Sequence, residues 1–360
     1  MLVHICCSVD SHFFLEKLQA DYPDEKLTGF FYDPNIHPYS EYRLRLLDVQ
    51  RSCRQLGIDL IEGGYNYETW LDLVRGFENE PEKGARCERC FDHRFDVSAH
   101  KALALGETKM TTTLLVSPLK SQQQLKASGA AFYKKYGVEF IAVDYRCGNG
   151  TQEQSRVSKE QKLYRQDYCG CLYGLRIQRD QQERLADELF SPVSNTVLPG
   201  SIEERLALYE ERMRLEDEGI AYEIIKEKFL NYRQFTCKLT LGKTHTPAAY
   251  ALCYSTLPRQ KVQGRMAHSI DNIFYLNREE VRFITLTEFN KHARTHYVDV
   301  KALIYQPPAF HEELQIRQHL LGSAFDLSPV IVVDTIPEGK LTLELHAKVY
   351  EDTKERLHLK

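Results

Sequence analysis

Leu2-Val-His-Ile-Cys-Cys-Ser-Val-Asp10 is the stretch of this chain around which we expect the fold to be organised. It has the pattern of a short apolar strand that ends in two adjacent cysteines, followed by an aspartate. A disulfide between neighbouring cysteines strains the intervening peptide, so Cys6 and Cys7 are poorly placed to bond to each other. Two sulfur ligands and a carboxylate at the end of a first strand are typical of the floor of a metal or redox site.

Strand-like and helix-like segments alternate outward from this stretch through the first half of the chain. Apolar strands separated by helices require crossover connections, which predict an α/β fold with a parallel sheet covered on both faces. The predicted strands are Leu2–Cys6, Leu27–Tyr32, Asp59–Gly63, Lys109–Ser117 and Val138–Asp144, and the predicted helices include Ser40–Leu56, Tyr67–Phe77 and Cys90–Leu105.

Polar residues follow several of these strands. Ligands of open parallel sheets bind at the carboxyl ends of the strands, near the point where the strand order reverses. We therefore expect one rim of the sheet to gather Cys6 and Cys7 with the segments Asp33–Pro38, Ser117–Lys120 and Asp144–Arg146.

The length of the chain, 360 residues, indicates two domains. Residues 1–190 form the predicted α/β domain, with the metal site, and residues 191–220 form a predicted helical linker. Strand patterns dominate residues 221–360, which predicts a separate strand-rich α+β domain without an assigned role.

Composition narrows the classes of function. The formal net charge of −4 excludes a chain that is basic throughout, although a tRNA-binding enzyme can concentrate positive charge in one cleft. With neither a long apolar run nor a secretion signal, the chain is expected to be a cytoplasmic protein without membrane association. No Walker loop, GxGxxG or HExxH motif supports nucleotide hydrolysis, dinucleotide binding or zincin chemistry.

The ten cysteines lie at spacings that favour metal ligation or redox catalysis over a disulfide framework. Cys87-x-x-Cys90 alone fits a zinc knuckle, an iron–sulfur ligand pair or a redox dithiol. Combined with Cys6 and Cys7 it favours a 4Fe-4S cluster, with zinc or purely structural cysteines as alternatives. Zinc normally uses two spaced pairs, because adjacent cysteines splay to opposite sides of a strand end. Four isolated cysteines are expected to be small buried hydrophobic residues: Cys53, Cys147, Cys237 and Cys253.

Two further features have competing interpretations. Asp10 is either an oxygen ligand of a second metal or the N-cap of a helix that begins at Ser11. Cys169-Gly-Cys171 can close a strained, easily reduced disulfide suited to electron relay, supply two more ligands, or form a loop without a redox role. Gly170 permits the tight backbone that either functional role needs.

Several polar side chains are candidates for contact with a polyanionic or sugar-like substrate. Arg and Lys bind phosphates, although an isolated one is more often a surface ion-pair partner. The basic candidates are Arg86, Arg89, Arg94, Lys120, Arg146, Arg156, Lys159 and Arg165. The loop after the second strand adds Tyr32, Asn35, His37 and Tyr39, although such a turn can also simply satisfy its own backbone.

These motifs together resemble the QueH-type epoxyqueuosine reductases over about the first 175 residues. The matching segments are Cys6-Cys7, Phe31-Tyr-Asp-Pro-Asn-Ile-His-Pro38, Glu41-Tyr-Arg43, Arg86-Cys-Glu-Arg-Cys90, Thr113-Leu-Leu-Val-Ser-Pro118, Ser158-Lys-Glu160 and Tyr164-Arg-Gln-Asp-Tyr-Cys-Gly-Cys171. The family often reads Cys-Cys-Ala-Pro-Cys where this chain reads Cys6-Cys-Ser-Val-Asp10. The absent third thiol suggests that it is not an indispensable ligand, and it makes Asp10 a candidate ligand of a second metal.

The resemblance implies a Rossmann-like fold of the HUP, or adenine-nucleotide-hydrolase-like, group. It implies a cobalamin-independent reductase that removes the epoxide oxygen of epoxyqueuosine at the tRNA wobble position, leaving the cyclopentene diol of queuosine. The implied ligands of a 4Fe-4S cluster are Cys6, Cys7, Cys87 and Cys90. Cys169 and Cys171 would be the redox-active pair, with an additional mononuclear iron beside the cluster. The expected partners are tRNA, with its modified base flipped out, and a low-potential ferredoxin or flavodoxin.

Two other classes of function compete with this interpretation. A cluster-dependent thiolase of tRNA would need an ATP pyrophosphatase loop of the Ser-Gly-Gly-x-Asp-Ser type after the first strand, where this chain reads Cys6-Cys-Ser-Val-Asp10. A zinc-stabilised nucleic-acid-binding module would be colourless and hold one zinc.

Overall fold

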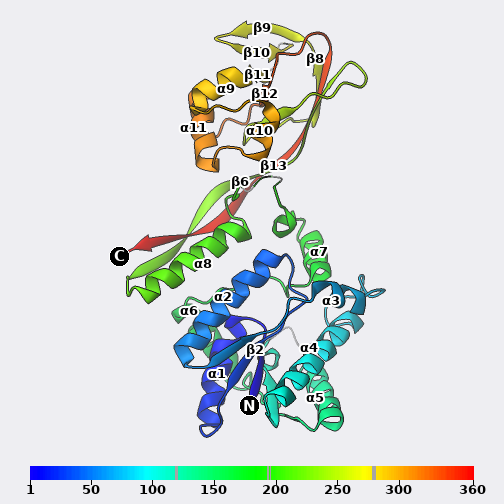
Figure 1. Cartoon of the computed structure of the whole chain (residues 1–360), viewed down its shortest axis with the longest axis vertical. Helices are drawn as coiled ribbons and strands as arrows, with labels where there is room; N and C mark the ends of the chain where they lie inside the picture. Colours follow the sequence, from blue (N-terminus) through cyan, green and yellow to red (C-terminus); the bar gives the residue numbers. More distant parts are fainter. Residues whose placement is uncertain (118–120, 193, 195, 278–280) are drawn as a thin grey trace. The chain divides into compact units, whose positions relative to one another are not determined.

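The computed structural model describes residues 1–117, 121–192, 194, 196–277 and 281–360. These residues divide into two compact units, which are described separately (Figure 1). Unit 1 comprises Met1–Leu189 and Arg205–Ile220, and unit 2 comprises Phe190–Glu204 and Ala221–Lys360. Within the described ranges, no helix combines the length and apolar character needed to cross a membrane.

Unit 1 is built on a five-stranded sheet in which every neighbouring pair of strands is parallel, with the order β3-β2-β1-β4-β5. Helices lie on both sides of it (Figure 1), with α1, α2 and α6 packed together and α4 packed on α5. The predicted Rossmann-like α/β fold is therefore confirmed. The strands are β1 (Leu2–Ile5), β2 (Thr28–Phe31), β3 (Asp59–Glu62), β4 (Lys109–Thr112) and β5 (Glu139–Phe140). The helices are α1 (Ser8–Asp21), α2 (Tyr39–Leu56), α3 (Tyr67–Leu73), α4 (Ala85–Ala104), α5 (Gln122–Tyr136), α6 (Gly150–Glu160) and α7 (Leu172–Gln181).

The strand order reverses between β1 and β4, at the centre of the sheet. The chain runs outward from β1 through β2 to β3, and then returns to the other side of β1 to form β4. All four residues of β1 are buried, because this strand has neighbours on both edges and helices on both faces. Cys6 and Cys7 follow β1 directly, so they lie at the switch point where ligands of such sheets bind.

Two predicted strands are shorter in the structure. The predicted strand Lys109–Ser117 ends at Thr112, whose side chain accepts a hydrogen bond from the Leu114 amide at 3.2 Å and caps a 3₁₀ turn, η1 (Thr113–Leu115). The predicted strand Val138–Asp144 shrinks to the two-residue edge strand β5, which pairs only with β4.

A helix follows residue 200, between the last strand of unit 1 and the first strand of unit 2. Helix α8 (Ile202–Asp217) is the polar helix that the sequence predicts there, and its greater part, from Arg205 onward, belongs to unit 1. In unit 1 its Arg212 is fully buried and forms an ion pair with Asp48 of α2 at 3.5 Å. A second short 3₁₀ turn, η2 (Asp187–Leu189), ends the first segment of unit 1.

Unit 2 is a strand-rich α+β unit, as the sequence predicts. One sheet has the order β7-β12-β11-β10-β9, and the other has the order β6-β13-β8. Its strands are β6 (Tyr222–Leu241), β7 (Ala249–Ala251), β8 (Lys261–Gly264), β9 (Met266–Ile270), β10 (Ile273–Leu276), β11 (Arg282–Thr285), β12 (Val330–Val333) and β13 (Leu341–Leu359). Its core contains several hydrophobic clusters, one of which includes residues of its helices α9 (Leu286–Ala293), α10 (Val300–Tyr305) and α11 (Phe310–Leu321).

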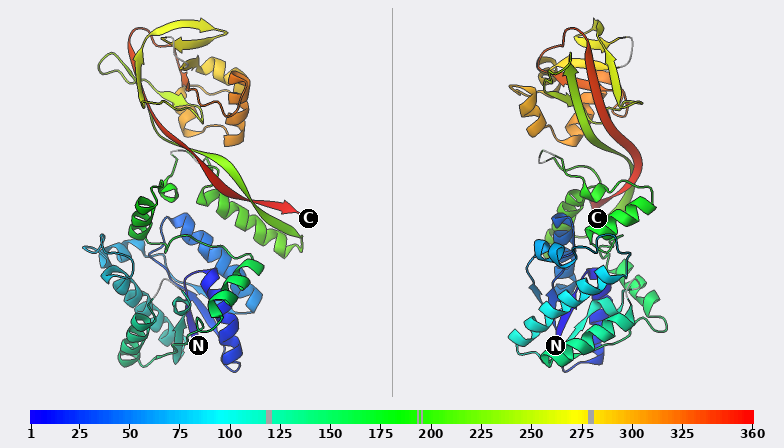
Figure 2. Two further views of the ribbon diagram at one scale, coloured as in Figure 1. Left: turned by 180° about the vertical axis from the view of Figure 1, so that it is seen from behind. Right: turned by 90° about the vertical axis from the view of Figure 1, so that its right-hand side faces the viewer.

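The longest feature of unit 2 is the antiparallel ribbon of β6 and β13, which lie side by side in both views of Figure 2. Pairing runs without interruption from Tyr222 opposite Leu359 to Leu241 opposite Leu341, with one irregularity between His346 and Ala347. The sequence patterns predict strands at Phe235–Leu241 and Leu341–Val349, which cover only the mutually paired parts of these longer strands nearest residues 241 and 341.

Candidate functional site

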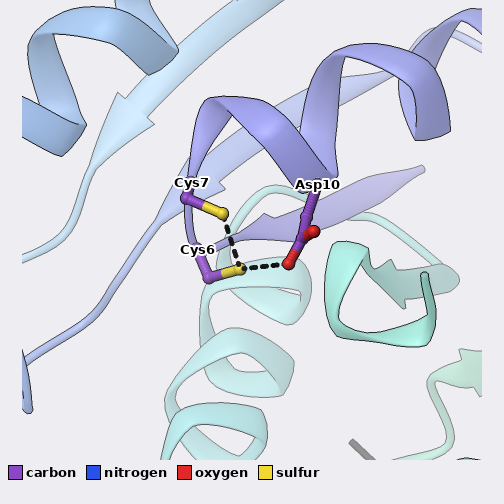
Figure 3. A group of neighbouring side chains, drawn as sticks. All are labelled: Cys6, Cys7 and Asp10. Atoms are coloured by element: carbon purple, nitrogen blue, oxygen red, sulfur yellow. Dashed lines mark hydrogen bonds between the residues drawn. The ribbon is translucent and has the colours of Figure 1, made fainter. Parts of the chain in front are cut away.

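Cys6, Cys7 and Asp10 form a compact group of metal-ligating atoms just after β1 (Figure 3). The Cys6 sulfur lies 3.7 Å from the Cys7 sulfur and 3.8 Å from Asp10 Oδ2, and one ligand atom from each residue lies within 4.8 Å of the others. The expectation that the adjacent cysteines splay apart is wrong. Because β1 ends at Ile5, the alternation of side chains in a pleated strand ends before them.

Asp10 is held in this position from a helix far along the chain. Its Oδ1 accepts a hydrogen bond from Gln154 Nε2 of α6 at 2.9 Å, while Oδ2 faces Cys6. The alternative role of Asp10 as an N-cap is wrong, because α1 begins at Ser8 with Cys7 in the N-cap position. Asp10 lies in the first turn of α1, where the helix dipole favours a negative charge.

The second cysteine pair lies in the first two turns of α4. The Lys83 amide donates a hydrogen bond to the Cys87 sulfur at 3.3 Å, and the Trp70 indole N–H donates one to the Cys90 sulfur at 3.3 Å. Burial raises the pKa of Cys90 to about 11, an effect that Arg94 and the Trp70 hydrogen bond oppose. Sulfur atoms that accept such bonds are stabilised as thiolates, the form that ligates metals.

Arg94 of α4 is a buried cation close to both cysteine pairs. Its guanidinium forms an ion pair with the equally buried Asp33, which follows β2. Burial lowers the pKa of Arg94, but Asp33, Cys90, Cys6 and Cys169 together raise it above its ordinary value. Sulfur atoms from three separate segments therefore lie within electrostatic range of one positive charge, which offsets part of the charge that thiolates would concentrate there.

The Cys169-Gly-Cys171 segment is fixed by α2 and by the loop after β2. Arg45 Nη1 and Nη2 donate to the carbonyl oxygens of Cys169 and Tyr168 at 3.2 Å and 3.1 Å. Gly170 has a φ of +106°, and a Cβ there would lie 2.9 Å from Ile36 Cγ1, so this backbone requires glycine as predicted. Cys171 is buried and packs with Cys90 and Trp70, whereas Cys169 is half-buried.

A cavity of about 340 Å³ brings several of these groups together. Its lining includes Cys6, Cys7, Asp10, Asp33, Arg94, Ser117, Gln154, Arg165, Gln166 and Cys169. This volume is at the small end of the range for ligand sites and suits one ring system, not a stack of nucleotides. Of the rim that the sequence predicts, the residues Cys6, Cys7, Asp33 and Ser117 line this cavity. The predicted segment Asp144–Arg146 does not line it, and residues 118–120 lie outside the described residues.

The donors in this region fit a thiolate-ligated iron group by their chemistry. None of the described cysteines forms a disulfide. Among the described residues, the compact group of ligand atoms comprises Cys6, Cys7 and Asp10 and does not include Cys87 or Cys90. Cys90 nevertheless acts on the same Arg94 guanidinium as Cys6 does. The hydrogen bond with Cys6, burial and the Asp10 carboxylate raise the pKa of Cys7 well above its ordinary value. Metal binding there would release a proton.

The predicted substrate-binding residues do not all lie at the cavity. Arg165 is exposed and lines the cavity. Tyr32 is buried, with its hydroxyl 3.0 Å from His93 Nε2, and Asn35 is buried in the same loop. His37 is half-buried and stacks on the Tyr67 ring at 4.9 Å.

Arg86 is not among the residues that line the cavity. The buried Arg86 guanidinium donates to the backbone carbonyls of Glu78 and Glu80 at 2.9 Å and 2.6 Å, so it organises the loop before α4. Lys120 lies outside the described residues.

Most of the other basic candidates have local partners. Arg89 lies over the Phe77 ring at 4.2 Å, Arg146 Nη1 donates to the Ser117 carbonyl at 3.1 Å, and Arg156 pairs with Glu160 at 2.6 Å. Lys159 and Tyr39 are exposed. Of the isolated cysteines, Cys53 and Cys253 are buried as expected and Cys237 is half-buried. The expectation of burial is wrong for Cys147, which is exposed in a turn.

Sequence reasoning missed two residues that shape the site, Arg45 and Gln154, and it placed Asp33 on the rim without assigning it a role. Arg45 follows Glu41 at the i,i+4 spacing of a helical ion pair, and the two are joined at 2.7 Å, so this spacing was a usable signal. Gln154 and Asp33 gave no such signal, because their partners lie in distant segments.

Comparisons with known proteins agree with this arrangement. A family model described as epoxyqueuosine reductase QueH matches residues 1–177. An epoxyqueuosine reductase QueH from Helicobacter pylori is 37% identical over 365 residues, covering 98% of this chain and 98% of its own. One from Thermotoga maritima is 33% identical over 189 residues, covering 52% of this chain and 95% of its own.

A solved structure, titled as a predicted subunit of tRNA methyltransferase from Methanocaldococcus jannaschii, matches 53% of this chain and 92% of its own at 12% identity, with a TM-score of 0.31. That similarity is too weak to bear on function. The full-length similarity to the Helicobacter pylori protein shows that this chain belongs to the QueH family of epoxyqueuosine reductases.

Proposed function

We propose that this protein is a cobalamin-independent epoxyqueuosine reductase that acts on tRNA. It would remove the epoxide oxygen of epoxyqueuosine at the wobble position and leave the alkene of queuosine. The reaction consumes two electrons and two protons and releases the oxygen as water. The observation that carries the proposal is the convergence of Cys6, Cys7 and Asp10 on a small cavity, in a chain of this family.

The proposed ligands of a 4Fe-4S cluster are Cys6, Cys7, Cys87 and Cys90, and Asp10 is the proposed oxygen ligand of an additional iron. When bound, these groups would supply single electrons and an oxophilic Lewis acid. The chain's own contribution is to orient the ligands. Gln154 fixes the Asp10 carboxylate, and Trp70 fixes the Cys90 sulfur.

The segment around Cys169 would act as the inner wall of the substrate site. Arg45 holds its backbone, so Cys169 reaches the cavity while Cys171 stays buried against Cys90. In our proposal this pair exchanges electrons or protons with the site, because Cys169 lines the cavity and neither cysteine forms a disulfide in this structure.

The substrate would be the anticodon loop of a tRNA, with its modified base flipped out so that the epoxide-bearing ring can reach the cavity. Arg165 at the cavity would hold a backbone phosphate. A low-potential ferredoxin or flavodoxin is the proposed electron donor. A tRNA substrate would place the protein in the cytoplasm.

The test is an anaerobic assay on tRNA that carries epoxyqueuosine, followed by nucleoside analysis by mass spectrometry. The iron-reconstituted wild type, given a chemical reductant and no cobalamin, should convert epoxyqueuosine to queuosine. Cys6→Ala and Asp10→Ala should not, while Cys53→Ala should retain activity because Cys53 lies in the core away from the site. A brown, reconstituted wild-type protein that leaves epoxyqueuosine intact would refute the proposal.

A further inference from the structure

Two side chains on the cavity wall carry a buried oxygen that has no hydrogen-bond partner within the described residues. They are Asp33, through Oδ2, and Gln166, through Oε1. Asp33 is only 1% exposed. Leaving a buried polar atom unpaired is costly, so such atoms are rare in native proteins unless a ligand or water completes them. Two of them on one small cavity indicate a ligand with matching donors.

The position of the Asp33 carboxylate is fixed by three other elements of unit 1. Its Oδ1 is engaged by Arg94 of α4, whose Nε donates to His4 Nε2 of β1 at 3.2 Å. The other His4 nitrogen, Nδ1, lies 2.8 Å from Thr112 Oγ1 of β4. Burial and Arg94 lower the pKa of His4 well below its ordinary value, so the ring is neutral, and its Nε2 lies 3.2 Å from both Arg94 Nε and the Tyr32 carbonyl oxygen. Oδ2 is thereby left oriented and available.

Both of these oxygens are acceptors, whereas the third such atom on the cavity wall, Arg94 Nη2, is a donor that faces Asp33 Oδ1 in their ion pair. Burial raises the pKa of Asp33 to about 6, against the opposing effect of Arg94 and Arg45, so the group is ionised above neutral pH. An ionised carboxylate only accepts hydrogen bonds, and the amide oxygen of Gln166 also only accepts. The complementary ligand therefore brings hydroxyl or N–H donors.

We propose that Asp33 and Gln166 recognise the two hydroxyl groups on the five-membered ring that carries the epoxide. This inference rests on the proposed function and adds which part of the substrate the site recognises. The epoxide must approach Cys6, Cys7 and Asp10, and the diol belongs to the same small ring, so both sets of groups have to fit one cavity. A base without the ring would leave both acceptors unpaired, and sites with unpaired buried acceptors reject such analogues strongly.

The experiment compares two anticodon stem-loop RNAs that differ only at the wobble base. One carries epoxyqueuosine, and the other carries a 7-deazaguanine whose side arm ends before the five-membered ring. Affinities are measured anaerobically by fluorescence anisotropy on the full-length protein. Wild type should bind the ring-bearing RNA at least about tenfold more tightly, the ratio expected from one hydrogen bond to a charged group. Asp33→Ala and Gln166→Ala should bring the ratio close to one, with the affinity for the ringless RNA unchanged.

Two matched variants separate recognition from general damage. Gln166→Glu keeps an acceptor oxygen and should keep the ratio, and Glu160→Gln on the exposed face of α6 should behave as wild type. If Asp33→Ala fails to fold, as judged by circular dichroism, the comparison of Gln166→Ala with Gln166→Glu decides the outcome.

The inference is overturned if wild type binds both RNAs equally, or if the alanine variants keep the wild-type ratio. Conversion of the ring-bearing RNA is followed in the same samples. A wild type that keeps the binding ratio but never forms queuosine would refute the proposed reaction and leave the recognition by Asp33 and Gln166 standing.

Discussion

Gln154 of α6 donates a hydrogen bond to Asp10 of α1 at 2.9 Å, across 144 residues of chain. The amide N–H fixes one carboxylate oxygen and leaves the other directed at Cys6. Partners that orient a metal-ligating carboxylate typically change metal affinity by about 10–100-fold when they are removed.

Replacing Gln154 should therefore weaken one metal position selectively. We expect Gln154→Leu to lower the iron-to-sulfide ratio of the anaerobically reconstituted protein, because Asp10 is no longer held, while sulfide content stays at the wild-type level. Glu153→Gln is the matched control, since Glu153 is the neighbouring residue and pairs only with the exposed Lys17. Equal losses of iron and sulfide in Gln154→Leu would contradict a separate site at Asp10.

Removing a proposed cluster ligand should have a different signature. Cys87→Ala should lower both the bound sulfide and the brown colour, because a 4Fe-4S cube that loses one of four thiolate ligands is less stable. Elemental and sulfide analysis beside Cys147→Ala, which removes an exposed cysteine, provides the measurement and its control. Full sulfide content in Cys87→Ala would mean that Cys87 is not a ligand.

The Trp70 indole should tune the redox centre through Cys90. A hydrogen bond to a ligating sulfur stabilises the reduced, more negative state, so its loss in Trp70→Phe should lower the reduction potential by on the order of 50 mV, the free energy of one hydrogen bond. A potentiometric titration followed by absorbance measures this shift. Tyr173→Phe, which changes a ring that stacks on Trp70 but donates nothing to Cys90, should leave the potential unchanged.

Arg165 should contribute to tRNA affinity in a salt-dependent way. A lost phosphate contact weakens binding of all tRNA sequences alike and reduces the slope of log K against log salt by about one. Binding isotherms of Arg165→Ala between low and physiological salt test this. Arg156→Ala is the control, because Arg156 is already paired with Glu160. An unchanged slope for Arg165→Ala would rule out the phosphate contact.

Glu313 in unit 2 gives a prediction for stability against pH. Its carboxylate is buried, accepts a hydrogen bond from the Tyr250 hydroxyl and another from the Cys253 amide at 2.9 Å, and burial raises its pKa. The folded state therefore keeps the proton to higher pH than the unfolded state does. The stabilisation is complete below the ordinary carboxyl pKa and is lost as pH rises through the folded pKa.

Urea unfolding of unit 2 should accordingly become easier by on the order of 1 kcal/mol as pH rises above about 4.5. Glu313→Gln, which cannot ionise, should flatten this dependence. Glu344→Gln removes an exposed carboxylate paired with Lys261 and should leave it in place. If Glu313→Gln kept the wild-type pH dependence of unfolding, another titrating group would be its cause.

Local patterns predicted the Rossmann-like sheet and the placement of Cys6 and Cys7 at its rim, because strand alternation and crossover length are properties of neighbouring residues. They failed where contacts join distant segments. The Asp33 carboxylate is held by an ion pair with Arg94, which itself donates to His4, and the Asp10 carboxylate is held by Gln154. Because the partners lie far apart in the chain, no periodic pattern of the sequence reveals these contacts. Because β1 ends at Ile5, the side chains of Cys6 and Cys7 point to the same site. The residue at which a strand ends is difficult to predict from a sequence pattern.

The paired strands β6 and β13 bear on when each part of the protein can acquire its structure. Every partner of β6 in this ribbon is supplied by Leu341–Leu359, so the ribbon cannot form on a ribosome until almost the whole chain has emerged. The strands of the unit 1 sheet, by contrast, are complete by Phe140. Because ordering the ribbon must first close the long intervening loop, unit 2 should be the slower-folding part and the one most exposed to misassembly during synthesis.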